Sequence, residues 1–267
     1  MELESSFEIE GRRREEAGFL EKLSGVRKPF LISYVLRIIP VFIDIVGYIL
    51  SGILWIKAFI HVKERVFIVA GALILAAGLL YGYQQVSQLF EVFPALSPSM
   101  GNVTQEQYIG SLINATEYSI HTYRSPLNLS VNGLLGVGLF FEAIAFIILY
   151  RRSSEVFKLR TPIMLIILGL LVLTIIPVSL QTASGLEEFV KELEEYTTGG
   201  KVLTQDEINQ LLLRYLSILM PLSMIGFLIL IVRIITYIFA ALAFKDLGKY
   251  LKQLKIMYTA PPPPPST

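Results

Sequence analysis

Three ionisable residues interrupt long apolar runs of this sequence: Asp44, Glu142 and Arg233. Each is followed four positions later by an aromatic residue, a spacing that places both side chains on one face of a helix. A charge inside hydrocarbon is costly and rarely faces lipid, so such a residue is a candidate for moving a proton, an ion or a polar substrate. These three residues are therefore the first candidates for function.

Two of these residues are predicted to form an ion pair. Asp44 and Arg233 each precede the lysine at the end of their apolar run by a similar distance, which puts both about 18–20 Å from one membrane boundary at ~1.5 Å per residue. Similar depth and opposite charge favour a contact between them. Glu142 lies closer to its own basic cluster, finds no cation at its depth in the sequence, and is predicted to remain unpaired. Arg37 is expected to extend to the outer surface.

Two interpretations of these charges stay open. A buried ion pair can fix the register of two helices without any further role. Alternatively, the charges line a path for ions, protons or a substrate. Gln84 and Gln85 would then join this lining near its outer mouth, although both could equally be residues of the outer interface.

Other chemistries find little support in the sequence. The chain has no cysteine, which excludes disulfides, thiolate metal sites and a cysteine nucleophile. Its two histidines, His61 and His121, are predicted on opposite sides of a membrane, so no histidine-based metal site is expected. Neither a phosphate-binding loop nor a Gly-x-Ser-x-Gly motif occurs. We therefore expect a protein that is not an enzyme and has no metal or cofactor.

The composition predicts a membrane protein, because 54% of the residues are hydrophobic and 17% are charged. Apolar runs of about 20 residues are long enough to cross a bilayer. We expect an all-α fold, a polytopic membrane helix bundle of five transmembrane helices with two helical extracellular loops. The predicted segments are a charged N-terminal arm (1–29), a hairpin of spans 1 and 2 (30–94), an outer loop (95–130), a hairpin of spans 3 and 4 (131–183), an acidic outer loop (184–216), span 5 with a basic inner helix (217–256) and a proline-rich tail (257–267).

The start of the first hairpin has an unusual length. Residues 30–60 are too long for one upright span and too short for two, and Pro40 interrupts the run. We predict that residues 30–39 enter at the membrane interface and that residues 38–57 form the first span.

The outer loop 95–130 contains three Asn-x-Ser/Thr sequons, at Asn102, Asn114 and Asn128. Three sequons in one loop favour an outward segment that carries glycans. A capping box from Thr104 to Gln107 predicts a helix that packs on another element. Asn114 would lie on this helix, which makes it a poorer acceptor than the other two.

The distribution of charge predicts the topology. The links between paired spans are short and basic, whereas segment 184–213 holds seven acids and two lysines. Because basic short loops stay cytoplasmic, the short links and the C-terminus are expected inside and both long loops outside a plasma membrane. Five spans then place the N-terminus outside, whereas it stays inside if residues 30–39 dip into the membrane and return. A second capping box, from Thr204 to Glu207, predicts the start of a helix that continues through the fifth span.

Four lysines follow the fifth span at helical spacing: Lys245, Lys249, Lys252 and Lys255. They have three interpretations, namely a positive anchor at the inner surface, a contact with anionic lipid and a docking surface for a cytoplasmic partner.

The five-span layout, with a large central outer loop, an outside N-terminus and an inside C-terminus, resembles the polytopic channel subunit of conjugation-type DNA transfer systems. Archaeal DNA-import systems have a related membrane component. The resemblance covers the layout alone and fixes no residue. It implies an integral membrane subunit of a transport or translocation assembly, whose partners are the lipid bilayer and other membrane or cytoplasmic subunits, including copies of itself. Nucleic acid is a partner only if the translocation interpretation holds.

Two other functions remain as alternatives. The first is an envelope protein of structural or interaction type, whose glycosylated outer loops bind partners at the cell surface. The second is a small proton-coupled solute carrier. The absence of cysteine is common in proteins of hot environments and, with the resemblance, favours an archaeal thermophile as the source.

Overall fold

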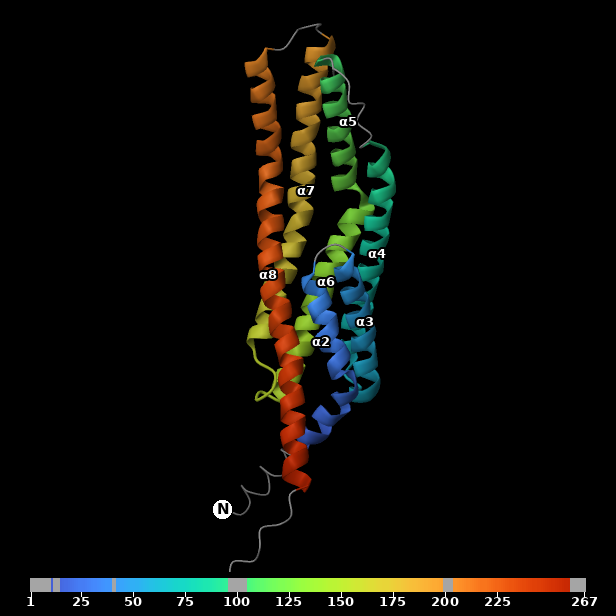
Figure 1. Cartoon of the computed structure of the whole chain (residues 1–267), viewed down its shortest axis with the longest axis vertical. Coiled ribbons are helices and arrows are strands. Elements are labelled where there is room, and N and C mark those ends of the chain that lie inside the picture. The colour runs from blue at the N-terminus through green and yellow to red at the C-terminus, as the bar shows by residue number, and fades with distance from the viewer. Residues whose placement is uncertain (1–10, 12–14, 40–41, 96–104, 199–203, 260–267) are drawn as a thin grey trace, which may run out of the picture. The chain divides into compact units, whose positions relative to one another are not determined.

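The computed structural model describes residues 11, 15–39, 42–95, 105–198 and 204–259 (Figure 1). Within these ranges the chain is helical and contains no strand, which confirms the predicted all-α fold. Seven helices have defined bounds: α2 (Ser24–Ile38), α3 (Ile43–Val62), α4 (Arg65–Ala95), α5 (Gln105–Arg124), α6 (Pro126–Arg152), α7 (Arg160–Thr198) and α8 (Gln205–Thr259).

Five of these helices are long and apolar enough to cross a membrane, as predicted: α3, α4, α6, α7 and α8. By length and composition, the chain is thus compatible with a multi-pass membrane protein. Helix α7 has 39 residues and α8 has 55. At ~1.5 Å per residue these helices are about 58 and 82 Å long, well beyond the ~30 Å of a hydrocarbon core.

Helix α2 differs from its prediction. The segment expected to dip into the interface is instead the end of a helix that packs against α3, and α3 begins at Ile43. The apolar residues of α2 explain this difference, because Val26, Phe30 and Tyr34 recur on one face and are fully buried. Pro40 lies outside the described residues, and α2 ends just before it.

The chain forms two compact units. Unit 1 comprises residues 1–79, 137–169 and 232–267, and unit 2 comprises residues 80–136 and 170–231. Helices α4, α6, α7 and α8 each contribute residues to both units.

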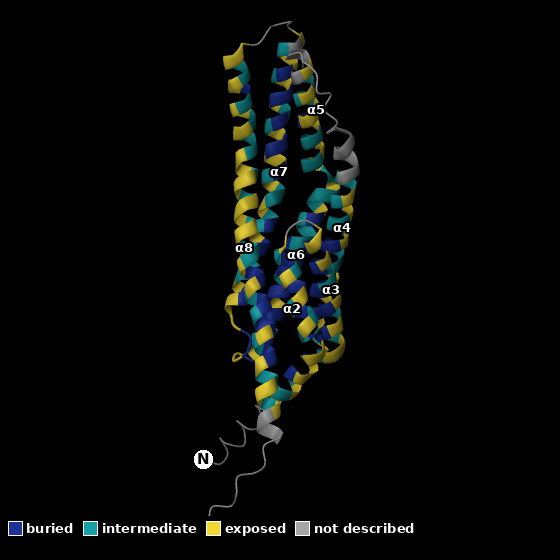
Figure 2. Ribbon diagram, in the orientation of Figure 1, coloured by how far each residue is buried: buried dark blue, intermediate teal, exposed yellow. Residues whose placement is uncertain are grey.

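Aromatic rings form much of the core of unit 1. Phe30 of α2 stacks on Phe244 of α8, with ring centroids 4.4 Å apart, and meets the edge of Trp55 of α3 at 4.9 Å. Phe146 of α6 packs against both Trp55 and Phe244. Helices α2, α3, α6 and α8 thus share one core, and Figure 2 shows the buried residues of these helices in dark blue.

Glycines allow the closest helix contacts of unit 1. A Cβ atom on Gly52 of α3 would lie 2.7 Å from the backbone nitrogen of Leu75, and one on Gly71 of α4 would lie 2.7 Å from the carbonyl oxygen of Gly52. The backbones of α3 and α4 therefore touch at this point, an approach that small residues permit in membrane helices. Gly78 of α4 also faces α3, since a Cβ atom there would lie 3.0 Å from the Cβ atom of Tyr48.

Unit 2 has an apolar core of a different kind. Ile109 of α5, Phe189 and Leu193 of α7 and Leu211 of α8 form one buried cluster. This cluster confirms the prediction of a helix in the first outer loop that packs on another element. The capping box at the start of α8 is also confirmed, because the Thr204 backbone N–H donates to Glu207 Oε2 at 2.8 Å and the Glu207 N–H donates to Thr204 Oγ1 at 3.3 Å. Thr104, in the other predicted box, lies outside the described residues.

Candidate functional site

A fully buried ion pair lies at the centre of unit 1. Arg37 Nη1 of α2 donates to both carboxylate oxygens of Glu142 of α6, at 3.1 and 2.9 Å, and neither side chain is exposed. Both predictions for these residues were therefore wrong, since Glu142 is paired and Arg37 points into the bundle. The physical reason is α2 itself, which joins the core and brings a cation to the depth of Glu142.

Two further groups hold the carboxylate of Glu142. The Tyr34 hydroxyl donates to Glu142 Oε1 at 2.6 Å, and the Trp55 indole N–H donates to the same oxygen at 2.9 Å. Oε1 thus accepts three hydrogen bonds, while Oε2 accepts the fourth from Arg37. Donors from two other helices compensate the loss of water around this buried charge.

Aromatic rings and a hydroxyl surround the Arg37 guanidinium. The rings of Tyr34, Tyr48 and Tyr237 have centroids 5.1, 4.7 and 5.1 Å from its central carbon, within the range of cation–π attraction. The hydroxyl groups of Tyr48 and Tyr237 are 3.0 Å apart, and Arg37 Nη2 donates to Ser51 Oγ. Arg37 Nε is buried without a hydrogen-bond partner among the described residues.

The predicted pair between Asp44 and Arg233 is present in the structure. Arg233 Nη2 of α8 donates to Asp44 Oδ2 of α3 at 2.8 Å. Arg233 Nε also donates to the backbone carbonyl of Arg37, at 2.9 Å, and so connects the two ion pairs. We call the connected residues the ionic cluster: Tyr34, Arg37, Asp44, Tyr48, Ser51, Trp55, Glu142, Arg233 and Tyr237.

A glycine of α3 lies against α2 beside Arg37, the residue whose contact with Glu142 was not predicted. A Cβ atom on Gly47 of α3 would lie 2.7 Å from the Arg37 backbone nitrogen and 2.9 Å from the Ser33 carbonyl oxygen of α2. Gly47 lies one turn after Asp44 in an apolar helix, where a glycine often indicates another backbone close by. Together with the Tyr34–Arg37 spacing on one helix face, this signal could have pointed to α2 as a core helix.

The two predicted glutamines lie in unit 2 rather than in unit 1 with the ionic cluster. Gln84 is buried and donates to Asn128 Oδ1 at 3.2 Å, while Gln85 is half-buried. Asn132 also donates to Asn128 Oδ1, at 3.1 Å. These amides form a local polar contact between α4 and α6.

The predicted glycosylation residues have different settings. Asn114 is exposed and lies on α5, as expected. Asn128, which we expected to be a better acceptor, also lies on a helix, and its side chain is engaged by Gln84 and Asn132. Asn102 is outside the described residues.

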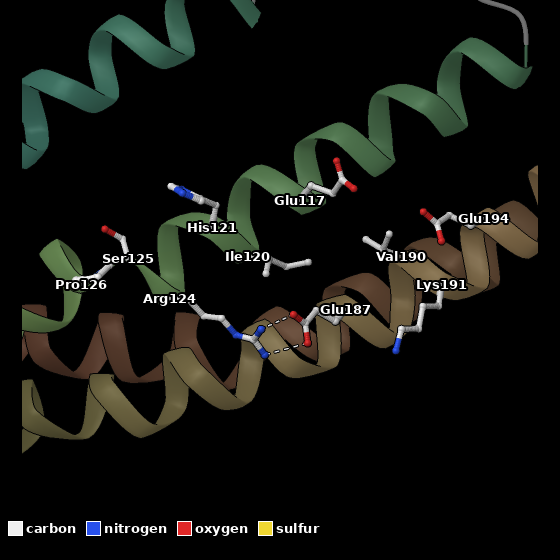
Figure 3. Close-up of a pocket in the computed structure, with 10 residues that line it drawn as sticks. All are labelled: Glu117, Ile120, His121, Arg124, Ser125, Pro126, Glu187, Val190, Lys191 and Glu194. Carbon is white, nitrogen blue, oxygen red and sulfur yellow. Dashed lines mark hydrogen bonds and ion pairs between the residues drawn. The ribbon is translucent and has the colours of Figure 1, made fainter.

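A cleft of about 670 Å³ lies in unit 2 beside α5 and α7 (Figure 3). Arg124 at its edge forms a double hydrogen bond with Glu187, one arm of which measures 2.9 Å. Glu117 and Glu194 project from α5 and α7 on either side of the cleft. The cleft is lined by Glu117, Ile120, His121, Arg124, Ser125, Pro126, Glu187, Val190, Lys191 and Glu194.

One tyrosine near this cleft has a shifted pKa. Burial, and secondarily the neighbouring Tyr215, raises the pKa of Tyr123 above its ordinary value of 10.0. Burial removes water from the charged phenolate and so favours the neutral phenol.

In the part of the chain that the structure describes, no group of three His, Asp or Glu residues is arranged to hold a metal ion. The four lysines that follow the fifth apolar span in the sequence are all exposed and lie on one continuous helix, α8. The candidate sites are thus the ionic cluster of unit 1, whose charges are paired, and the cleft of unit 2. No protein-family model, curated protein or solved structure matches the chain.

Proposed function

We propose that the protein is a membrane-embedded, non-enzymatic subunit of a larger assembly, of which a transport or translocation assembly is the leading kind. The proposal rests on one observation about α8. An 18-residue apolar stretch of this helix has none of its residues buried, whereas the other four candidate spans bury 28–50% of theirs.

The most exposed large side chains of α8 lie on one side of the helix. Five large apolar side chains of this helix are at least 59% exposed, and they recur at intervals of three or four residues. Such spacing produces a continuous stripe, the pattern by which helices pack against one another. We call these residues the α8 stripe: Leu213, Leu216, Met220, Met224 and Phe227.

Hydrocarbon and a helix of another subunit would both accept such an apolar stripe, because either can cover the side of α8 that faces away from its own unit. Gly226 favours a partner helix, because it is exposed on the same stretch of α8, a Cβ atom there would have nothing within 4 Å, and the glycine leaves room for another helix to approach closely. Figure 2 shows the exposed residues of α8 in yellow.

The ionic cluster supports a fixed scaffold within this subunit. Glu142 accepts four hydrogen bonds and is fully buried, and Asp44 is paired with Arg233. Charges held in this way set helix positions, and they favour the interpretation of a register-fixing pair over a lining of an open path. Any transported substrate would then pass along a surface that this subunit shares with its partners.

Single cysteines test this proposal, because the chain has none of its own. Phe227→Cys, on the stripe, is expected to form a crosslinked species in native membranes treated with a short crosslinker that carries one thiol-reactive and one photoreactive group, because the photoreactive group needs no cysteine on the partner. Leu170→Cys is the matched control, since Leu170 is an apolar residue of the same unit that is 54% exposed but lies on α7.

Mass spectrometry of the crosslinked species identifies the partner as another protein or a second copy. Either identity, obtained with Phe227→Cys and not with Leu170→Cys, supports the assembly. Equal crosslinking of both variants, or a monomer in membranes and in mild detergent, would overturn it.

The cleft in unit 2 favours a second candidate function, an envelope protein of interaction type. Its volume suits a small ligand or a peptide side chain, and charged groups of both signs line it. Asp44→Asn and Arg233→Leu test the role of this pair in either function. Loss of transport at normal protein abundance would show that the pair serves transport directly, whereas loss of abundance alone would show that the pair is architectural.

A further inference from the structure

A basic groove of about 430 Å³ lies in unit 1 between α2 and the C-terminal part of α8. Five of its lining residues are cations, two from α2 and three from α8: Arg27, Lys28, Lys245, Lys249 and Lys252. None of its described lining residues is acidic. Asp246, nearby on α8, lies 3.7 Å from Lys249 and offsets one of the five charges. The groove therefore offers a concentrated positive charge to an anion.

Packing between the two helices gives the groove its shape. The Arg27 guanidinium lies directly over Gly248, so close that a Cβ atom there would clash with it. Phe30 stacks on Phe244 at 4.4 Å and joins the same two helices one turn away. The groove is thus built by complementary residues on both helices, and it is more than a row of lysines on one helix.

An apolar strip continues from the cations along each helix. On α2, Lys28 is followed at helical spacing by Ile32 and Val35, which are 53% and 45% exposed. On α8, Lys245 is preceded by Ile238 and Ile235, which are 42% and 38% exposed. Each helix therefore presents charge at one end of a surface strip and apolar side chains along the rest.

We propose that this groove binds the phosphate-bearing headgroup of an anionic membrane lipid, with acyl chains along the strips that begin at Ile32 and Ile238. A soluble anion would need the cations alone, whereas a lipid needs cations and an adjoining apolar surface, and the groove has both. Basic pockets between membrane helices are known binding sites for such headgroups. The inference rests on the membrane character of the apolar helices and is independent of the partner proposed for α8.

Native mass spectrometry of the full chain tests this inference. The protein is exposed in detergent to equal amounts of phosphatidylglycerol and phosphatidylcholine, and bound lipids are counted. We expect phosphatidylglycerol to be retained at least about tenfold more than phosphatidylcholine. In the triple variant Lys245→Gln, Lys249→Gln, Lys252→Gln, retention of phosphatidylglycerol should fall to the phosphatidylcholine level.

A charge-matched triple variant separates the groove from general attraction. Lys57→Gln, Arg65→Gln, Arg151→Gln removes three exposed cations of the same unit from outside the groove. It should retain phosphatidylglycerol like the unmodified chain. Equal loss in both triple variants would overturn the proposal, as would equal retention of the two lipids by the unmodified chain.

Two more measurements keep the result interpretable. Ile32→Asn keeps every cation and interrupts the apolar strip, so it should lower lipid retention severalfold without lowering the Tm in neutral detergent. Inorganic phosphate and glycerol phosphate, added at millimolar concentration, should displace little of the bound lipid. Stabilisation of the protein by these soluble anions equal to that by phosphatidylglycerol would overturn a lipid site.

Discussion

The two units of the molecule use the same ion-pair chemistry in opposite settings. In unit 1, Arg37 and Glu142 are paired with no exposed surface on either side chain. In unit 2, the side chains of Arg124 and Glu187 are also paired but are 43% and 41% exposed. A buried pair must replace all its lost water contacts, whereas an exposed one remains hydrated and is screened by salt.

The difference shows where each unit depends on polar contacts. Unit 1 needs every donor around Glu142, because an unpaired charge would be left without water. Unit 2 is held mainly by its apolar cluster, with exposed pairs such as Arg214–Glu192 on its surface. Equivalent substitutions should therefore lower the stability of the two units by different amounts.

The largest effect is expected at Glu142. Glu142→Gln leaves the Arg37 charge buried without its counter-ion, which should destabilise unit 1 by about 3–5 kcal/mol. Unfolding in detergent, followed by the fluorescence of Trp55, measures this change. Because an apolar replacement removes both charges, Arg37→Met with Glu142→Leu should be more stable than Glu142→Gln alone. If the double variant is the less stable, the buried pair contributes more to stability than apolar side chains in its place would, and the expectation is wrong.

The apolar cluster of unit 2 should give the next largest change. Phe189→Ala removes a fully buried ring and should cost about 3 kcal/mol, at the lower end of the range for such substitutions. Hydrogen exchange of α5 and of the start of α8 should increase, while exchange in α2 and α3 stays the same. An equal increase in α2 would show that the two units do not unfold separately.

Two glycines give a matched comparison of intermediate size. Gly52→Ala in unit 1 forces a Cβ atom against the α4 backbone and should cost about 1–3 kcal/mol. Gly226→Ala in unit 2 meets nothing within 4 Å and should stabilise its helix by up to about 1 kcal/mol. Midpoints of denaturant unfolding give both values, and changes of the same sign would contradict the packing described for unit 1.

Removal of an exposed pair should have a small effect. Arg124→Gln should cost about 1 kcal/mol or less, and the difference from the unmodified chain should shrink further as salt is raised. Thermal unfolding at low and high salt measures it. A loss as large as that of Glu142→Gln, independent of salt, would mean that this pair is shielded from water.

The smallest effect concerns pH and Tyr123. Because burial favours the neutral phenol, the pKa of Tyr123 is higher in the folded chain than the ordinary value of 10.0. Its contribution to stability is complete below about pH 10 and is lost as pH rises through the raised folded-state pKa. Tyr123→Phe should reduce the loss of stability of unit 2 above pH 10. An unchanged pH profile would show that other groups dominate the alkaline transition.

Periodicity and charge were enough to predict several features of the chain. The five apolar helices, helix α5 and the start of α8 follow from patterns within one segment. The contact between Asp44 and Arg233 follows from their similar distances to the ends of two apolar runs. A single sequence is enough for these predictions, because each needs only the residues of one segment or the distance of a residue from the end of its apolar run.

The pairing of Arg37 with Glu142 depends on a different kind of information. It requires that α2 enter the core, and the apolar positions of α2 describe an amphipathic helix equally suited to a membrane surface. The choice between these arrangements is made by residues on three other helices, including Gly47, which gives α2 room, and Tyr237, which covers the guanidinium. A contact of this kind between distant segments leaves only indirect local signals, such as the glycine at position 47.

The paired residues of the ionic cluster are far apart in the sequence, so the ribosome makes the two partners of each pair at different times. Arg37 and Glu142 are 105 residues apart, and Asp44 and Arg233 are 189 apart. At about 5–20 residues per second, Glu142 is made about 5–20 s after Arg37, and Arg233 is made about 10–40 s after Asp44. Throughout these intervals each earlier charge lacks its final partner. Each early charge needs water or other polar groups around it until its partner has been made, so we expect the bundle to reach its final packing only after Arg233 has been synthesised.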